Sequence, residues 1–428
     1  MKDGLDVFEN IETRFAEGFA LCAEQGVKLP SAELRYSVLQ TAHDDYGGYG
    51  HADDFAAAHL AYYLFRDLHS RTDEAPEAMT LLGDYFFSLF SKFLIPVDSV
   101  PLIDAFSERL TAQTTEVADG CEAETARMIS AGGKRLRPSL AYLCYKMGSG
   151  SIGHIIGSGN RKSSVKSDTD RKPIMPLMTM LELMHTASLI HDDVVDDAHI
   201  RRGTGTINAA KGKAFAVNAG DFLLAKAMTQ LHHYRGTGIN EALAGVSAEM
   251  CLGEFQQRRT AFDLDAQSEY LYLLQIRRKT ASLLAASCYC GALAGGLSEE
   301  HAEALRCFGE RFGTAFQMLD DLKDYSDDAG KDAGQDIRSG IFTLPVLLLK
   351  DRLPDEIRKL LETRDKDEAD ICRIMDYVRS TDALLTAREQ ISRLSGEAME
   401  ALTLFPCPDR SEKSALIQLA DSIIHFSK

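Results

Sequence analysis

Long apolar runs, an excess of positive charge and a paired cysteine pattern are all missing from this sequence of 428 residues. Its longest apolar runs, such as residues 344–349, fall far short of the roughly 20 residues that a helix needs to cross a bilayer. Lysine and arginine total 47 against 64 aspartates and glutamates, giving a net charge of -17 that argues against a broad nucleic-acid surface. The nine cysteines lack disulfide or metal-binding spacing and residues 1–6 lack the pattern of a secretion signal, so we expect reduced thiols and a cytoplasmic location. These absences exclude a membrane-spanning protein, a disulfide scaffold and a general nucleic-acid binder.

Signals for β-structure are also scarce. There is no tryptophan, there are only 11 prolines, and alternating apolar and polar residues bounded by turn residues are hard to find. Segments rich in Ala, Leu and Glu show a 3.6-residue periodicity instead, for example residues 269–293 and 383–405. The sequence therefore predicts an all-α fold with enough length for a sizeable core.

Two segments interrupt the helical pattern. Two prolines within residues 95–101 separate an N-terminal helical region, residues 1–94, from a larger domain, residues 95–428. Residues 148–173 begin rich in glycine and serine and continue basic and polar, which predicts a flexible loop between two helices.

The densest group of chemically useful side chains is an aspartate cluster at residues 191–197, His-Asp-Asp-Val-Val-Asp-Asp. In a helix, Asp192 and Asp196 lie on one face, as do Asp193 and Asp197. A solvated acidic face is an alternative, because exposed like charges cost only about 0.2–0.5 kcal/mol per pair. The apolar neighbours favour a cleft instead, where two carboxylates about 6 Å apart repel by roughly 3 kcal/mol and need a cation.

A second cluster repeats the Asp-Asp-x-x-Asp spacing at Asp320, Asp321 and Asp324, again with apolar neighbours. Carboxylate oxygens without Cys or His partners favour a hard ion. Mg²⁺ in particular binds one or two carboxylates together with waters and phosphate oxygens. The pair of clusters therefore predicts Mg²⁺ that bridges the protein to a phosphorylated substrate.

Positive charge is confined to short clusters near these motifs. Arginine forks suit bidentate phosphate contact, and lysine acts as a point charge. Any one cluster is more often an ordinary surface charge, but their placement beside both acidic motifs makes them candidate phosphate ligands. The candidates are Lys134 and Arg137, Arg201 and Arg202, Lys279 with Thr280, and Lys331.

Taken in order, these motifs resemble the trans-isoprenyl diphosphate synthases, the polyprenyl synthetase family. The resemblance covers roughly residues 95–428. It rests on GGKRLRP from residue 132, ELMHTASLIHDD from residue 182, and the arginine, Lys-Thr and second aspartate motifs that follow. It implies an isoprenoid-synthase helical bundle around a deep central cavity, assembled as a homodimer or alternatively as a heteromer.

The resemblance also implies a role for each motif residue. Catalysis would depend on Asp192, Asp196, Lys279 and Asp320. Mg²⁺ would be bound at Asp192, Asp196, Asp320 and Asp324, with Asp193 in support. Isopentenyl diphosphate would be held by Lys134, Arg137, His185 and Arg202, and the allylic diphosphate, farnesyl or longer, by Arg201, Lys279, Thr280, Gln317 and Lys331. Without this context, His185 would be taken for an ordinary helix histidine.

The implied reaction is ionisation of the allylic diphosphate, attack by the isopentenyl double bond, and loss of a proton. Ser188 and Ala187 are small where the family places a bulky floor for short products, which implies a medium or long all-trans polyprenyl diphosphate. Met184 and Leu181 are candidates for a deeper floor or for plain core. We expect the product to supply the side chain of a quinone or a related carrier.

Three departures from the family pattern stand out. Residues 340–345 lack a lysine that the family often carries, and loop 148–173 is longer than usual. Residues 81–90 faintly resemble the small subunit of two-component heptaprenyl diphosphate synthases, with extra packing helices as the alternative. Within them, GDYFF at 83–87 echoes GDFLL at 220–224, although chance can produce so short a match.

Other functions were weighed against this one. A class I terpene cyclase ionises the same substrates, but it usually carries a different second metal motif and does not need Lys134, Arg137 and Arg202. A di-iron bundle would need two Glu-x-x-His motifs, and this region supplies only one, from Glu182 to His185. A catalytic or regulatory subunit of a hetero-oligomeric synthase is the remaining alternative, although regulatory subunits tend to lose the aspartates that are intact here.

Overall fold

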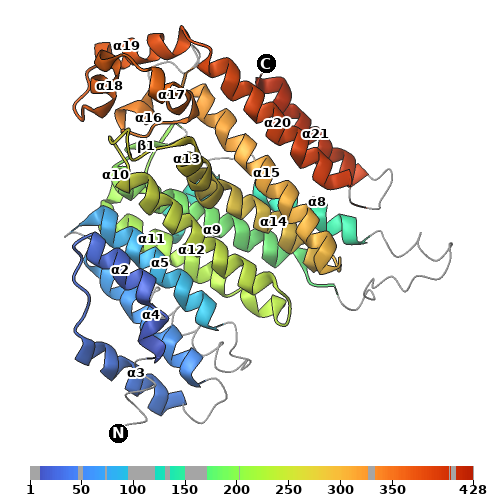
Figure 1. Ribbon diagram of the computed structural model, residues 1–428. Helices are drawn as coiled ribbons and strands as arrows, with labels where there is room; N and C mark the ends of the chain where they lie inside the picture. Colours follow the sequence, from blue (N-terminus) through green and yellow to red (C-terminus); the bar gives the residue numbers. More distant parts are fainter. Residues whose placement is uncertain are drawn as a thin grey trace, which may run out of the picture. The chain divides into compact units, whose positions relative to one another are not determined.

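The structure, a computed structural model, is helical almost throughout the residues that it describes (Figure 1). These are residues 10–46, 52–72, 75–94, 121–130, 135–149, 171–201, 203–325, 333–403, 405 and 411–427. The all-α prediction is confirmed. Within these ranges every helix is too short or too polar to cross a bilayer, and the eight cysteines are free thiols.

The chain forms two compact units, and each is described by itself. The first contains residues 1–139 and 172–251. Its elements are α2 (Ala16–Glu24), α3 (Ala32–Tyr46), α4 (Ala52–Ser70), α5 (Pro76–Leu94), α7 (Cys121–Ser130), α9 (Ile174–Val195), β1 (Ile200–Arg201), β2 (Thr204–Gly205), α10 (Ile207–Lys211), α11 (Lys213–Met228), the 3₁₀ turn η3 (Leu231–Tyr234) and the first part of α12 (Ile239–Arg259).

The second unit contains residues 140–171 and 252–428. Its elements are most of α8 (Leu136–Ser149), the end of α12, α13 (Glu269–Ile276), the π-helical turn η4 (Arg277–Ala281), α14 (Ser282–Ala294), α15 (Glu299–Lys323), α16 (Gln335–Arg338), α17 (Leu344–Leu349), the 3₁₀ turn η6 (Lys350–Arg352), α18 (Asp355–Glu362), α19 (Glu368–Arg379), α20 (Ala383–Thr403) and α21 (Ser411–Ser427).

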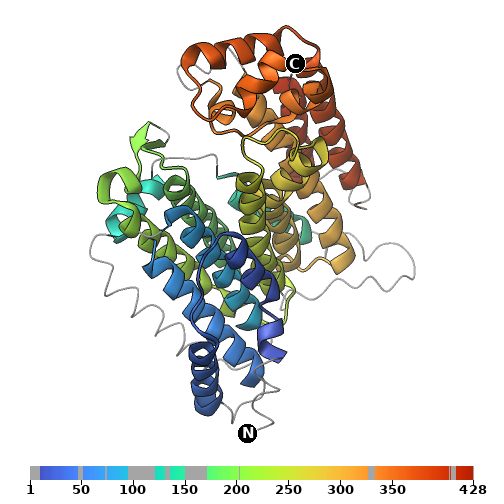
Figure 2. The same cartoon turned by 60° about the vertical axis from the view of Figure 1, so that its left-hand side comes forward.

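In the first unit, α9 packs along α11, and the N-terminal helices α4 and α5 form a hairpin that contacts the same pair (Figure 2). The apolar core between α9 and α11 contains Ala187, Ile190 and Val194 from one helix and Val217 and Leu223 from the other. Spacings of three and four residues place the α9 side chains on one face of the helix. This packing leaves the opposite face of α9 for polar side chains.

In the second unit, α14, α15, α20 and α21 pack in that order, each against the next (Figure 1). Helix α15 begins at the N-cap Ser298, whose hydroxyl accepts from the backbone of His301. Its first turn carries two glutamates, which suit the positive end of the helix dipole.

The helical periodicity at residues 269–293 and 383–405 is matched by α13–η4–α14 and by α20. The break at residues 95–101 lies outside the described residues, as do residues 150–170 of the expected loop. The division into regions 1–94 and 95–428 therefore stays a prediction.

Candidate active site

The first aspartate motif lies where α9 ends. Asp192 is half-buried, Asp193 is buried, and Asp196 is the exposed C-cap, whose N–H donates to the Asp192 carbonyl at 2.8 Å. Asp197 turns away with a positive φ of 49°. The expectation that Asp193 and Asp197 share a helix face is therefore wrong, because the helix ends at Val195 before it can include Asp197.

Asp193 and Asp197 each have a basic partner. Nε of Arg201, on β1, donates to Oδ1 of Asp193 at 2.6 Å. Burial raises the pKa of Asp193, and the charge of Arg201 opposes this shift. Asp197 pairs with Lys213 at 3.0 Å, which lowers its pKa. The structure thus confirms that Arg201 lies beside the first motif, and it shows that the arginine contacts an aspartate there.

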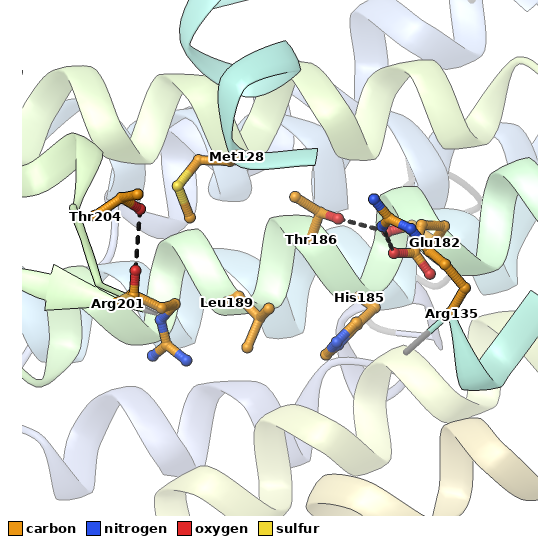
Figure 3. A pocket seen from close by; sticks show the side chains of 8 residues that line it. All are labelled: Met128, Arg135, Glu182, His185, Thr186, Leu189, Arg201 and Thr204. Carbon is orange, nitrogen blue, oxygen red and sulfur yellow. Dashed lines mark hydrogen bonds and ion pairs between the residues drawn. The ribbon is translucent and has the colours of Figure 1, made fainter. Parts of the chain in front are cut away.

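A pocket opens on the polar face of α9 (Figure 3). The side chains of His185, Leu189 and Arg201 point to the same side of the helix, and Arg135 pairs with Glu182 at one end. The lining residues are Met128, Arg135, Glu182, His185, Thr186, Leu189, Arg201 and Thr204. The pocket therefore brings together two of the predicted substrate ligands, His185 and Arg201.

Arg135 is a basic residue of this pocket that the sequence reasoning did not select. Besides pairing with Glu182 it donates to the carbonyl of Ile129. It lies between Lys134 and Arg137, which the sequence predicted as phosphate ligands. The prediction therefore found this basic cluster but did not include Arg135.

The second aspartate motif lies at the end of α15. Asp320 is exposed and accepts from Lys323 at 2.8 Å. Asp321 accepts from the hydroxyl of Tyr272 at 2.7 Å and from the amide of Gln317 at 2.8 Å. The hydroxyl of Thr280 donates to the same Gln317 side chain at 2.9 Å. Thr280 and Gln317, both predicted to bind the allylic diphosphate, thus form a chain of hydrogen bonds that ends on the motif.

Negative charge accumulates around Asp321. Burial, together with the charges of Asp320 and Asp324, raises its pKa to about 6, although the hydrogen bonds from Tyr272 and Gln317 act in the opposite direction. Asp336, on α16, also has a raised pKa, because of burial and the charges of Asp321 and Asp324. The sequence reasoning missed Asp336, since a single aspartate outside a motif gives no pattern to recognise.

Asp324 holds the segment that follows the motif. Its two carboxylate oxygens accept from the backbone N–H groups of Gly334, Gln335 and Asp336 at 2.9, 3.2 and 3.2 Å. This bonding fixes the start of α16 beside the end of α15. The role of Asp324 as a metal ligand stays a prediction.

Lys279 and Thr280 belong to the π-helical turn η4, a distortion that occurs often at functional sites. Lys279 forms an ion pair with Glu254 of α12, whose side chain is buried. A buried carboxylate holds a lysine in place more firmly than solvent would, because the low local dielectric strengthens the attraction. The carboxylate partner was not predicted, since it lies 25 positions away with no shared motif.

The structure describes only one of the remaining predicted substrate ligands. Arg137 is half-buried on α8. Lys134, Arg202 and Lys331 lie outside the described residues. The roles of all these residues in substrate binding stay predictions.

Both motifs offer the ligand atoms that a hard cation prefers. They offer carboxylate oxygens without cysteine or histidine, which suits Mg²⁺. The first motif also stands at the negative end of the α9 dipole, and in the second motif burial together with the charges of Asp320 and Asp324 raises the pKa of Asp321. The residues present therefore fit Mg²⁺.

Comparison with known proteins identifies this set of motifs. Residues 119–378 match the family model described as Polyprenyl synthetase, which is more than half of the chain. The chain belongs to the polyprenyl synthetase family. Helices α2 to α5 all precede the matched residues.

Three relatives illustrate this membership. Heptaprenyl diphosphate synthase component 2 of Geobacillus stearothermophilus is 34% identical over 65% of this chain and 82% of its own length. The crystal structure of a decaprenyl diphosphate synthase from Rhodobacter capsulatus is 30% identical, with a TM-score of 0.63 over 76% of this chain and 97% of that one. A polyprenyl synthase from Caulobacter crescentus, crystallised with calcium and isoprenyl diphosphate, is 31% identical, with a TM-score of 0.61 over 77% of this chain and 98% of that one. The predicted family and the isoprenoid-synthase type of fold are confirmed.

Proposed function

We propose that the chain is a Mg²⁺-dependent prenyltransferase. It condenses isopentenyl diphosphate with an allylic diphosphate, farnesyl or longer, into a medium or long all-trans polyprenyl diphosphate for quinone side chains. The observation that carries this proposal is the pair of intact Asp-Asp-x-x-Asp motifs in a family member, each with basic or amide side chains beside it. The names of the heptaprenyl and decaprenyl relatives support the product class.

The side chains of this protein would bind and orient the two diphosphates. His185, expected to hold isopentenyl diphosphate, and Arg201, expected to hold the allylic diphosphate, line one pocket on α9, and side chains of this kind donate to diphosphate oxygens. Lys279 and the pair Thr280–Gln317 would hold the allylic diphosphate beside the second motif. Bound Mg²⁺ would neutralise the negative charge that develops on the leaving diphosphate.

The direct test uses the purified full chain with isopentenyl diphosphate, farnesyl diphosphate and Mg²⁺, followed by chain-length analysis of the products. We expect linear polyprenyl diphosphates, and we expect their formation to stop when EDTA removes the metal. A cyclic hydrocarbon would show a terpene cyclase instead. No turnover until a second protein is added would show one subunit of a hetero-oligomeric synthase.

The subunit alternative has one specific support, because the Geobacillus relative is named as component 2 of its synthase. A homodimer and a cytoplasmic location also stay predictions. In this proposal, the N-terminal region, residues 1–94, is an extension added to a catalytic domain of residues 95–428.

A further inference from the structure

Four ionisable side chains meet in the buried centre of the first unit, where none of them is one of the motif aspartates of the proposed active site. They are His69 on α4, Asp84 on α5, His191 on α9 and Asp221 on α11. The side chains of the two histidines and of Asp221 are at most 3% exposed, and that of Asp84 is 15% exposed. Each histidine pairs with the aspartate of the other helix pair. Nδ1 of His69 lies 2.7 Å from Oδ1 of Asp221, and Nδ1 of His191 lies 2.7 Å from Oδ2 of Asp84.

The two halves of this cluster match position by position. Nε2 of His69 faces the carbonyl of Thr80, four residues before Asp84, at 3.0 Å. Nε2 of His191 faces the carbonyl of Val217, four residues before Asp221, at 3.1 Å. The longer diagonal distances, from Nε2 of each histidine to the aspartate of its own helix pair, are both 3.7 Å.

The glycines before the two aspartates match as well. A Cβ on Gly83 would lie 2.0 Å from the ring of His69, and a Cβ on Gly220 would lie 2.0 Å from the ring of His191. Only glycine allows either ring to pack so close to the helix. The five-residue echo between 83–87 and 220–224 therefore marks the same structural role in two helices.

Such reciprocal pairing is the property of an interface with two-fold symmetry, in which residue i contacts j and j contacts i. Here both sides belong to one chain. Helices α9 and α11 lie within the family match, whereas α4 and α5 precede it. Helices α4 and α5 also carry an apolar core of their own, in which Leu60, Leu64, Leu68 and Leu82 are fully buried.

We propose that the α4–α5 hairpin takes the place of a partner subunit. It covers the face of α9–α11 by pseudo-two-fold His–Asp pairing and positions the first aspartate motif. The positioning follows from the sequence, because His191 directly precedes Asp192 on α9. Asp84 fixes the ring of His191 and thereby the rotation of the last turn of α9. A homodimer of this chain would then have to use another face, because this one is already covered.

The oxygen and nitrogen atoms of His69, Asp84 and Asp221 lie within 4.8 Å of one another and could hold a metal ion. The hydrogen bonds argue against a metal. Each histidine places one ring nitrogen on a carboxylate and the other on a backbone carbonyl. Both partners are hydrogen-bond acceptors, so each ring nitrogen is aimed at an acceptor of the protein rather than at a shared metal position.

The test compares three full-length variants by hydrogen exchange of backbone amides. Asp84→Asn removes the charge that pairs with His191. Arg66→Gln, a milder change, removes only the 4.0 Å ion pair between Arg66 and Asp221. Asp67→Asn is the matched control, because Asp67 pairs with Arg71 one turn further along the chain and not with a member of the cluster.

We expect Asp84→Asn to speed exchange in the last turn of α9 and in α11, Arg66→Gln to do so more weakly, and Asp67→Asn to leave both helices unchanged. Faster exchange confined to α4 and α5 would overturn the proposal, since extra helices that merely pack on the domain would behave in that way. Should Asp84→Asn fail to fold, Arg66→Gln alone decides by the same criterion. A divalent metal that copurifies with the wild-type chain and is lost in Asp84→Asn would also overturn it.

Kinetics provide a second readout. If Asp84 positions the first motif, Asp84→Asn should lower kcat by about tenfold or more, because small misplacements near reacting groups are costly. KM for isopentenyl diphosphate should stay within about twofold. An unchanged kcat would remove the positioning role. This readout rests on the proposed prenyltransferase activity, whereas the exchange experiment does not, so a failure of either can be told from a failure of the other.

Discussion

Nε of Arg201 lies 2.6 Å from Oδ1 of Asp193, a residue that is only 1% exposed, at the point where the first aspartate motif leaves α9. Asp197, four residues later in the same motif, pairs with Lys213 in solvent at 3.0 Å. Each pair joins a carboxylate to a basic side chain, and the two are close in the sequence. The first pair is buried at its aspartate, whereas the second is exposed.

This difference predicts unequal losses of stability. Arg201→Gln leaves a buried carboxylate without its charged partner, so we expect the free energy of unfolding to fall by about 1–3 kcal/mol. Lys213→Gln breaks an exposed pair and is expected to cost less stability than Arg201→Gln, because solvent screens the attraction. Urea denaturation of both variants measures the two losses, and equal losses would contradict the role given to burial.

The aspartates of the first motif are expected to differ in their effect on turnover. Asp192→Asn and Asp196→Asn remove carboxylates proposed to bind Mg²⁺, which contributes several kcal/mol to stabilising charge in the transition state, so kcat should fall about 100-fold or more. Asp197→Asn should leave kcat within about twofold, because that side chain pairs with Lys213. Steady-state rates at saturating Mg²⁺ decide, and a comparable loss in Asp197→Asn would show that the motif acts only through its total charge.

The regular part of this molecule was predictable from the sequence. Periodicity alone located the helical segments 269–293 and 383–405, because apolar faces repeat at the helical period whatever they pack against. The aspartate spacing likewise located both acidic motifs, and family motifs led to Thr280 and Gln317, which the structure joins by a hydrogen bond.

Contacts between residues far apart in the sequence were not predictable in this way. Glu254 and Asp336 look like ordinary surface charges until folding buries Glu254 beside Lys279 and brings the half-buried Asp336 near Asp321. The π-helical distortion at Arg277–Ala281 leaves no mark on an apolar repeat. The match of GDYFF to GDFLL was visible but too short to be trusted, and only the reciprocal pairing of His69 and His191 gives it meaning.

The hydrogen bond between Thr280 and Gln317 predicts a binding defect rather than a chemical one. Thr280→Val keeps the shape of the side chain but removes the donor to Gln317. We expect KM for the allylic diphosphate to rise roughly fivefold, equivalent to about 1 kcal/mol, with little change in kcat. Ser282→Ala is the matched control, since its hydroxyl bonds only to the carbonyl of Arg278 one turn back. A loss confined to kcat in Thr280→Val would place this threonine in the chemical step instead.

Product length can be tested at two adjacent positions of α9 that differ in burial. Ala187 is fully buried in the core shared with α11, whereas Ser188 is only half-buried, with its hydroxyl on the carbonyl of His185 at 2.9 Å. Ser188→Phe is therefore expected to shorten the polyprenyl product at nearly unchanged stability, because this position lies outside the fully buried core. Ala187→Phe overfills the core and should cost about 1–3 kcal/mol of stability. Chain-length analysis together with thermal unfolding separates the two effects. Wild-type product lengths from Ser188→Phe, or short products from a fully stable Ala187→Phe, would show that the growing chain does not pass the face of α9 that carries Ser188.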